Sequence, residues 1–294
     1  MQLRAFGRTG LQVPVLGFGA MQVGDPDFPE DEAARVLNGV VDAGLTLIDT
    51  ARSYGVSEER IGRHLAHRRD EFVLSTKVGY GVAGVPDWTY DSVVLGVDAA
   101  RARLRTDVID IVHLHSCSRD VLRTGAVVAA LQHCLAQGTI RVAAYSGDDD
   151  ALAFAQQCGA FGSLQASLNL CDQQSLHVLD AARGSGVGTI VKRSLAGRPW
   201  SGRAAAIEPA HVEYRRRFAI LRREFGCEPA DWDDLALRFA LYGGPVDCVI
   251  VGGRDFRHMQ RNLAAVVAGP LPEELGAACR QAFARVGQDW RGLI

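Results

Sequence analysis

Four side chains that can give or take protons stand at the ends of three apolar segments, 45–48, 72–76 and 108–114. They are Asp49, Tyr54, Lys77 and His115. Such apolar runs are typical of buried strands, and parallel-sheet proteins place their chemistry at the carboxyl ends of these strands. We therefore expect a carboxylate, a phenol, an amine and an imidazole to meet at one end of a sheet.

These residue types together suit proton transfer to an oxygen atom. A phenol has a reference pKa of about 10, so Tyr54 donates its proton readily only if a neighbour stabilises the phenolate. Lys77 would do this, and Asp49 would keep the ammonium in place and charged. His115 would be a second donor to a carbonyl oxygen. The set predicts reduction of a carbonyl by hydride, or the reverse oxidation of an alcohol.

Strand-like and helix-like segments alternate along the whole chain and would position these residues. The predicted strands are 15–19, 45–49, 72–77, 108–115, 140–146, 163–166, 188–192 and 248–251. Apolar residues at helical spacing lie between them, in segments such as 31–42, 91–104, 121–136 and 152–158. This pattern predicts an α/β fold, a closed parallel (β/α)8 TIM barrel, with an N-terminal β-hairpin over residues 3–14 closing the bottom of the barrel.

Composition, charge and cysteine content limit the classes of protein to which this chain can belong. The 294 residues are 48% hydrophobic, which suits a single domain over 1–294. A net charge of -2 and a pI near 6.4 argue against a nucleic-acid or anionic-membrane partner. The sequence shows no secretory signal and no apolar run of membrane-spanning length. Seven scattered cysteines without a CxxC pair are typical of a reducing compartment, so we expect a cytoplasmic protein.

The chain resembles the aldo-keto reductase family over nearly its whole length. The motifs that carry the resemblance are segments 49–55, 58–62, 75–77, 114–116, 138–141 and 145–147, residues Gln165 and Asn169, and segment 252–262. The resemblance implies a catalytic tetrad of Asp49, Tyr54, Lys77 and His115. In this tetrad Tyr54 is the general acid/base, Lys77 and Asp49 tune it, and His115 orients the carbonyl.

The resemblance also implies a nicotinamide cofactor that binds without a glycine-rich GxGxxG loop. Ser146 and Gln165 would hold the carboxamide of the nicotinamide. Residues implied to line its ribose side are Gly19, Ala20, Met21 and Asp49. Further cofactor-binding residues are expected after the last two strands: Lys192, Arg193, Ser194, Leu195, Gly252, Gly253, Arg254, His258, Arg261 and Asn262.

Segment 252–262 favours NADP(H) as the cofactor, with NAD(H) as the alternative. It opens a predicted helix with small residues and places basic groups beside its positive end, which suits an additional phosphate. The chain departs from the family pattern at three places. Gly147 replaces the usual Asn after Ser146, Gly252 stands where many members have Lys, and Lys192–Arg193 stands where an aromatic residue often stacks on the nicotinamide.

The predicted substrate is a small-molecule carbonyl or alcohol. Its pocket is expected to include loops 79–90 and 198–210, which follow two of the strands. The candidate pocket residues are Met21, Tyr54, Trp88, His115 and Trp200. No predicted helix has an unusually apolar outer face, so the sequence predicts no particular oligomeric state.

Three other functions remain open at this point. His113 and His115 face the same way on a strand and form an HxH pair, as in zinc hydrolases, but no further histidine stands at a later strand end, so we expect no metal. Lys192 at a strand end would suit a Schiff-base aldolase. Some proteins that resemble this family bind the cofactor and act as redox-sensing subunits with little turnover.

Overall fold

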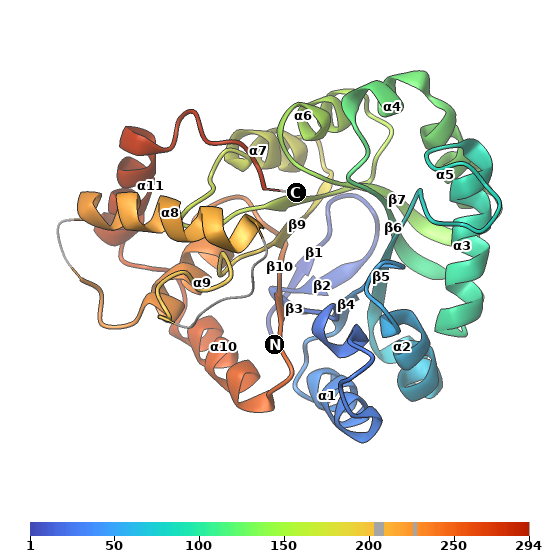
Figure 1. Ribbon diagram of the computed structural model, residues 1–294, viewed down its shortest axis with the longest axis horizontal. Coiled ribbons are helices and arrows are strands. Elements are labelled where there is room, and N and C mark those ends of the chain that lie inside the picture. The colour runs from blue at the N-terminus through green and yellow to red at the C-terminus, as the bar shows by residue number, and fades with distance from the viewer. Residues whose placement is uncertain (203–208, 226–227, 294) are drawn as a thin grey trace.

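A closed parallel barrel is the centre of the computed structural model, which describes residues 1–202, 209–225 and 228–293. The strands follow one another around the barrel in the order β10-β3-β4-β5-β6-β7-β8-β9 (Figure 1). They are β3 Leu16–Gly19, β4 Leu47–Asp49, β5 Val73–Val78, β6 Ile109–His115, β7 Ile140–Ser146, β8 Ser163–Ser167, β9 Gly188–Lys192 and β10 Cys248–Gly252. The predicted (β/α)8 barrel is confirmed.

Helices follow the strands and cover the outside of the barrel (Figure 1). The α-helices are α1 Glu30–Asp42, α2 Ser57–Leu65, α3 Tyr90–Leu104, α4 Arg119–Thr124, α5 Ala126–Ala136, α6 Asp149–Gln157, α7 Leu176–Gly184, α8 Pro209–Glu224, α9 Trp232–Tyr242, α10 Phe256–Ala268 and α11 Glu273–Val286. Two short 3-10 helices, η1 Gln22–Gly24 and η2 Ala66–Glu71, lie in connections.

A hairpin of β1 Leu3–Ala5 and β2 Gln12–Pro14 closes the barrel at the end where the strands begin. The buried side chain of Phe6 packs in one apolar cluster with Ile111 and Ile190 of the barrel strands. Gly7 makes this approach possible, because its φ is +52° and a Cβ atom there would lie 2.5 Å from the Gly186 carbonyl oxygen. The predicted hairpin is therefore confirmed.

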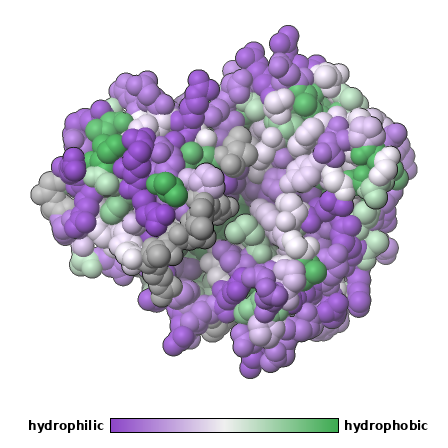
Figure 2. Space-filling model, in the orientation of Figure 1, coloured by the Kyte–Doolittle hydropathy of each residue, from purple (hydrophilic) through white to green (hydrophobic). Residues whose placement is uncertain are grey.

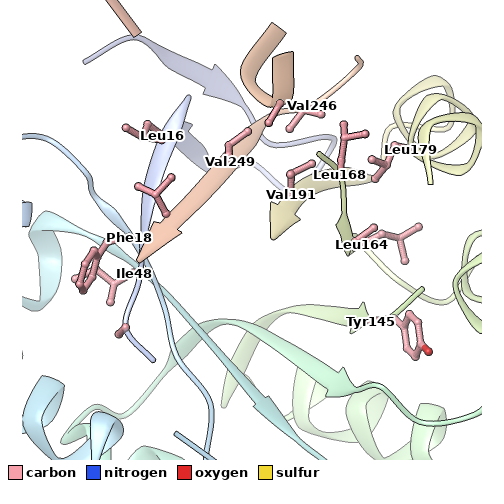
Figure 3. Close-up of a cluster of buried hydrophobic side chains, with 14 of the residues drawn as sticks. Leu16, Phe18, Ile48, Tyr145, Leu164, Leu168, Leu179, Val191, Val246 and Val249 are labelled. Carbon is pink, nitrogen blue, oxygen red and sulfur yellow. The ribbon is translucent and has the colours of Figure 1, made fainter. Parts of the chain in front are cut away.

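A second apolar layer lies between the barrel and its helices. Leu16, Phe18, Val191 and Val249 from the strands belong to one buried cluster (Figure 3), which also contains Leu37 of α1. Burial of each such side chain contributes about 1.5–3 kcal/mol. Because side chains alternate along a strand, the outward packing of these residues turns their neighbours to the barrel interior.

The structure corrects one helix boundary. Segment 121–136, expected as one helix, forms α4 and α5, which meet at Gly125. Gly125 has φ +79°, a left-handed conformation that ends α4, and its N–H donates to the Leu122 carbonyl. β4 also begins at Leu47 rather than at Leu45, because the Leu45 N–H closes the end of α1 by donating to the Val40 carbonyl.

The visible outer face is mostly hydrophilic, with apolar residues in small separate patches (Figure 2). No helix within the described residues is both long and apolar enough to cross a membrane. Cys117, Cys134, Cys158, Cys171 and Cys248 are free thiols, and Cys227 lies outside the described residues.

Candidate active site

The four side chains expected at the strand ends line one cavity of about 540 Å³. The Lys77 ammonium donates to Oδ2 of Asp49 at 2.5 Å and to the Thr50 carbonyl at 2.8 Å. Its Nζ lies 4.9 Å from the centroid of the Tyr54 ring. The rings of Tyr54 and His115 meet edge to face, 6.1 Å between centroids. The structure thus brings together the phenol, amine, carboxylate and imidazole.

Charge pairing keeps Lys77 and Asp49 ionised although both are buried. Burial by itself would lower the pKa of the Lys77 ammonium, but Asp49 and Tyr54 outweigh it and raise that pKa. For Asp49, burial would raise the pKa of the carboxyl, but Lys77 and His113 outweigh it and lower that pKa. A fixed positive charge therefore lies beside the Tyr54 ring.

Hydrogen bonds hold the Asp49 carboxylate in position. Its Oδ1 accepts from Ser75 Oγ at 2.8 Å and from Gln165 Nε2 at 2.9 Å. The Gln165 amide oxygen in turn accepts from Ser146 Oγ at 2.9 Å. Ser146 lines the cavity, whereas Gln165 lies behind it. His113, the first histidine of the HxH pair, is wholly buried with its Nε2 3.1 Å from Ser75 Oγ.

His115 is held as a neutral imidazole. Burial, with the nearby ammonium groups of Lys77 and Lys192, lowers the pKa of His115 to about 3. The Tyr80 hydroxyl lies 2.8 Å from His115 Nδ1, and the two rings stack at 5.5 Å. Tyr80 was not among the expected site residues. The sequence feature that could have indicated Tyr80 is an aromatic residue two positions after Val78, the last residue of β5.

Most of the expected cofactor residues line one of two adjoining cavities. The cavity at the tetrad is also lined by Gly19, Met21, Ser146, Lys192, Arg193, Ser194, Leu195 and Gly252. A second cavity, of about 760 Å³, is lined by His258, Arg261 and Asn262 of α10. Leu195, Arg198 and Gly252 line both cavities. An elongated ligand can therefore reach from Tyr54 to the start of α10.

Four expected cofactor residues line neither cavity: Gln165, whose contacts are described above, and Ala20, Gly253 and Arg254. Ala20 is buried, and its carbonyl accepts from Ser57 Oγ. Gly253 stands beside Gly252, with Met259 3.2 Å from the place of a Cβ atom. Arg254 forms an ion pair with Asp25 and lies 5.1 Å above the ring of Phe28. The guanidinium of Arg254 therefore links two loops instead of facing either cavity.

The two expected tryptophans do not line the tetrad cavity. Trp88 packs against the Tyr80 ring, with 5.4 Å between the ring centroids. Trp200 donates from Nε1 to Asp233 at 2.7 Å and stacks on Trp232 at 6.2 Å. Residues 203–208 of the expected pocket loop lie outside the described residues. Side chains that the sequence did not single out, Gln22, His211 and Tyr214, line the cavity instead. The last two come from α8, far along the chain, and no spacing pattern marks them.

Gly147 has a steric reason to replace the usual asparagine. A Cβ atom at this position would lie 2.3 Å from the Tyr145 hydroxyl oxygen, and that hydroxyl donates to the Cys117 carbonyl at 2.8 Å. Tyr145 is wholly buried, so it cannot move aside at low cost. The large side chain of Tyr145 therefore occupies the space that a side chain at position 147 would need.

Lys192 lies in the same cavity, 3.2 Å from Oδ2 of Asp148. Burial lowers the pKa of the Lys192 ammonium despite this ion pair. Ser167 donates to both oxygens of Asp148. Within the described part of the chain, no cluster of three or more His, Cys, Asp or Glu side chains is suited to a metal ion.

Comparisons with known proteins agree with this geometry. The Aldo/keto reductase family model matches residues 15–283. The chain is 27% identical to L-galactose dehydrogenase from Arabidopsis thaliana, over 90% of this chain and 88% of that protein. It is 32% identical to D-threo-aldose 1-dehydrogenase from Pseudomonas sp, over 47% of this chain and 51% of that protein. The holo form of aldo-keto reductase AKR11C1 from Bacillus halodurans superposes with a TM-score of 0.83, 26% identity and 96% coverage of both chains.

Proposed function

Since the chain belongs to the aldo/keto reductase family and is therefore an oxidoreductase, we propose that it interconverts an aldehyde or ketone with the corresponding alcohol, using NADP(H). The observation that carries this proposal is the buried Lys77–Asp49 pair beside the Tyr54 ring, with neutral His115 lining the same cavity. A fixed cation beside a phenol suits proton transfer to an oxygen that gains negative charge.

Each residue of the tetrad has one role in the proposed reduction. Tyr54 gives its proton to the carbonyl oxygen of the substrate as negative charge develops there. Lys77 stabilises the charge left on the phenolic oxygen, and Asp49 holds the ammonium in place. His115 donates a hydrogen bond to the same substrate oxygen. In the oxidation of an alcohol, Tyr54 takes the proton back.

The two adjoining cavities fit a dinucleotide that spans them. Ser146 would bind the carboxamide of the nicotinamide, and Lys192 to Leu195 would line the passage between the cavities. Arg261 and His258 would contact the phosphate that distinguishes NADP from NAD, with NAD(H) as the alternative cofactor. When bound, the nicotinamide supplies the hydride for reduction or accepts it in oxidation.

The substrate class is proposed from the relatives together with the cavity. Two relatives are named as dehydrogenases of a sugar, so aldoses are the first substrates to test. The cavity suits them, because polar side chains such as Gln22, Arg193 and His211 line it beside the tetrad. Met21, half exposed at the mouth, offers an apolar surface for larger carbonyl compounds.

Turnover assays test the proposal. The full chain is incubated with aldoses, aromatic aldehydes and ketones in the presence of NADPH or NADH, and with aldoses and the corresponding alcohols in the presence of NADP+ or NAD+. Cofactor absorbance is followed in both directions. We expect substrate-dependent turnover with at least one carbonyl–alcohol pair. Cofactor binding by fluorescence quenching without turnover on any compound would contradict the proposal and favour a redox-sensing subunit.

A Schiff-base aldolase is a second candidate because Lys192 faces the cavity and burial lowers the pKa of its ammonium. Borohydride trapping with an aldehyde or ketone distinguishes the two functions. A reductase gives no substrate-dependent adduct on Lys192, whereas an aldolase gives one that disappears in Lys192→Arg.

We also propose that residues 1–294 form one domain, which is supported by the packing of the hairpin into the barrel. A cytoplasmic location is proposed from the scattered cysteines, which contain no CxxC pair and of which Cys117, Cys134, Cys158, Cys171 and Cys248 are free thiols.

A further inference from the structure

Tyr80 contacts His115 through both its hydroxyl group and its ring. Its hydroxyl oxygen is 2.8 Å from His115 Nδ1, and the two rings lie 5.5 Å apart at an angle of 22°. The ring of Tyr80 therefore covers the imidazole while its hydroxyl engages one ring nitrogen. His115 Nε2 is the ring nitrogen left to meet a ligand in the cavity that His115 lines.

The loop after β5 is built to hold Tyr80 in this place. The ring of Trp88 packs on the Tyr80 ring, with 5.4 Å between the centroids. The backbone N–H of Trp88 donates to the Gly79 carbonyl at 2.7 Å. A Cβ atom at Gly79 would lie 2.3 Å from the Trp88 ring, and Gly79 has φ +127°, so only glycine fits. The Asp87 carboxylate accepts from the Gly81 N–H at 2.7 Å and closes the loop.

The protonated nitrogen of a neutral histidine is set by the hydrogen bond that the other nitrogen makes. If a donor engages Nδ1, that nitrogen is the acceptor and Nε2 carries the hydrogen. The opposite tautomer would present the Nε2 lone pair to the cavity and repel a carbonyl oxygen. His115 remains neutral at pH 7, since its pKa is lowered to about 3, so the choice of tautomer matters.

We propose that Tyr80 is a positioning residue: its hydroxyl donates to His115 Nδ1 and so holds His115 as the Nε2–H tautomer, which donates to the substrate carbonyl. The functional part of this inference rests on the proposed carbonyl reduction. The tautomer itself does not depend on turnover, and it can be measured in the protein without a substrate.

The first test measures the tautomer directly. The full chain is labelled with 15N on its eight histidines, and the His115 ring signals are assigned by their loss in His115→Gln. At pH 7 we expect His115 to show a protonated Nε2 and an unprotonated Nδ1. In Tyr80→Phe, which keeps the stacked ring, both 15N shifts move towards an average of the two tautomers. An Nδ1–H tautomer in the wild type, or unchanged shifts in Tyr80→Phe, overturns the inference.

The second test measures catalysis. Tyr80→Phe is expected to lower kcat/KM for carbonyl reduction about tenfold, mainly through kcat, with cofactor affinity unchanged. The matched control is Tyr242→Phe, which removes a half-buried hydroxyl that donates to the Val266 carbonyl on the outer side of the barrel. Equal loss of activity in both variants would overturn the catalytic part. If the wild type reduces no carbonyl compound, the proposed function fails, while the 15N shifts still decide the tautomer.

Discussion

Lys77 and Asp49 form a hydrogen-bonded ion pair of 2.5 Å whose side chains are only 1% and 2% exposed. An enclosed pair of this kind depends on both members, because either charge alone would lack compensation. The pair joins β4 to β5 beside the Tyr54 ring. It therefore contributes to the chemistry of the site and couples that chemistry to the stability of the barrel.

Lys77→Met is expected to reduce the free energy of unfolding by about 3–5 kcal/mol at pH 7, because Asp49 loses its partner. Asp49→Asn combined with Lys77→Met should recover most of this loss, since no buried charge remains. Urea unfolding followed by circular dichroism measures both. A double variant no more stable than Lys77→Met would contradict the pairing argument.

Tyr54→Phe should lower turnover by about 10³-fold while the affinity for the cofactor stays the same, because only the proton donor is removed. Steady-state kinetics and fluorescence quenching give the two quantities. Near-normal turnover in this variant would remove Tyr54 from the mechanism.

Asp172 should make the stability of the barrel depend on pH. Burial, with the charge of Asp148, raises the pKa of the Asp172 carboxyl to about 7. In the unfolded chain this carboxyl ionises near its reference pKa of about 4, so between pH 4 and 7 the native state holds a proton that the unfolded state has lost. The contribution of Asp172 to stability is therefore greatest below pH 4 and falls as pH rises to about 7.

We expect the difference in unfolding free energy between Asp172→Asn and the wild type to shift in favour of the variant by a few kcal/mol from pH 4.5 to pH 8, since one proton contributes about 1.4 kcal/mol per pH unit. Urea titrations at four pH values across this range measure the difference. A difference that stays constant would show that Asp172 has an ordinary pKa.

Arg261→Ala should raise KM for NADPH about tenfold and leave KM for NADH nearly unchanged, because only NADP carries the additional phosphate. Arg285→Ala is the matched control, since Arg285 of α11 is about half exposed, pairs with Glu224 of α8 and lines neither cavity. Equal changes for the two cofactors would mean that Arg261 does not contact this phosphate.

Gly147→Asn should destabilise the protein by about 1–3 kcal/mol, because its Cβ atom would overlap the buried Tyr145 side chain. Adding Tyr145→Val should restore much of the stability by making room. Gly184→Asn is the control, since a Cβ atom there meets nothing within 4 Å. Thermal unfolding compares the variants, and a stable Gly147→Asn single variant would refute the steric argument.

Much of the barrel could be predicted because its strands carry continuous apolar runs with polar residues at their ends. Asp49, Lys77 and His115 stand directly at such ends, so position along the chain is enough to bring them together. The hairpin was also predictable, since its turn residues Gly7 and Gly10 separate two short apolar segments.

The remaining features depend on loop geometry and on contacts between distant segments. Tyr80 reaches His115 only because the loop after β5 folds around Gly79 and Trp88. Trp200 does not line the tetrad cavity, and its indole N–H donates to Asp233, 33 residues further along the chain. Periodicity along the chain reports neither kind of contact, because it describes one element at a time.

The pairing of β3 with β10 has a consequence for synthesis. Leu16 of β3 pairs with Val249 of β10. The ring of hydrogen bonds around the barrel is therefore complete only after β10, the last strand, has been made. While a ribosome is still making residues 20–247, both edges of the growing sheet expose unpaired backbone groups that can bind other chains. We therefore expect nascent chains to be most prone to aggregate just before β10 emerges, when a chaperone bound to these edges would protect them most.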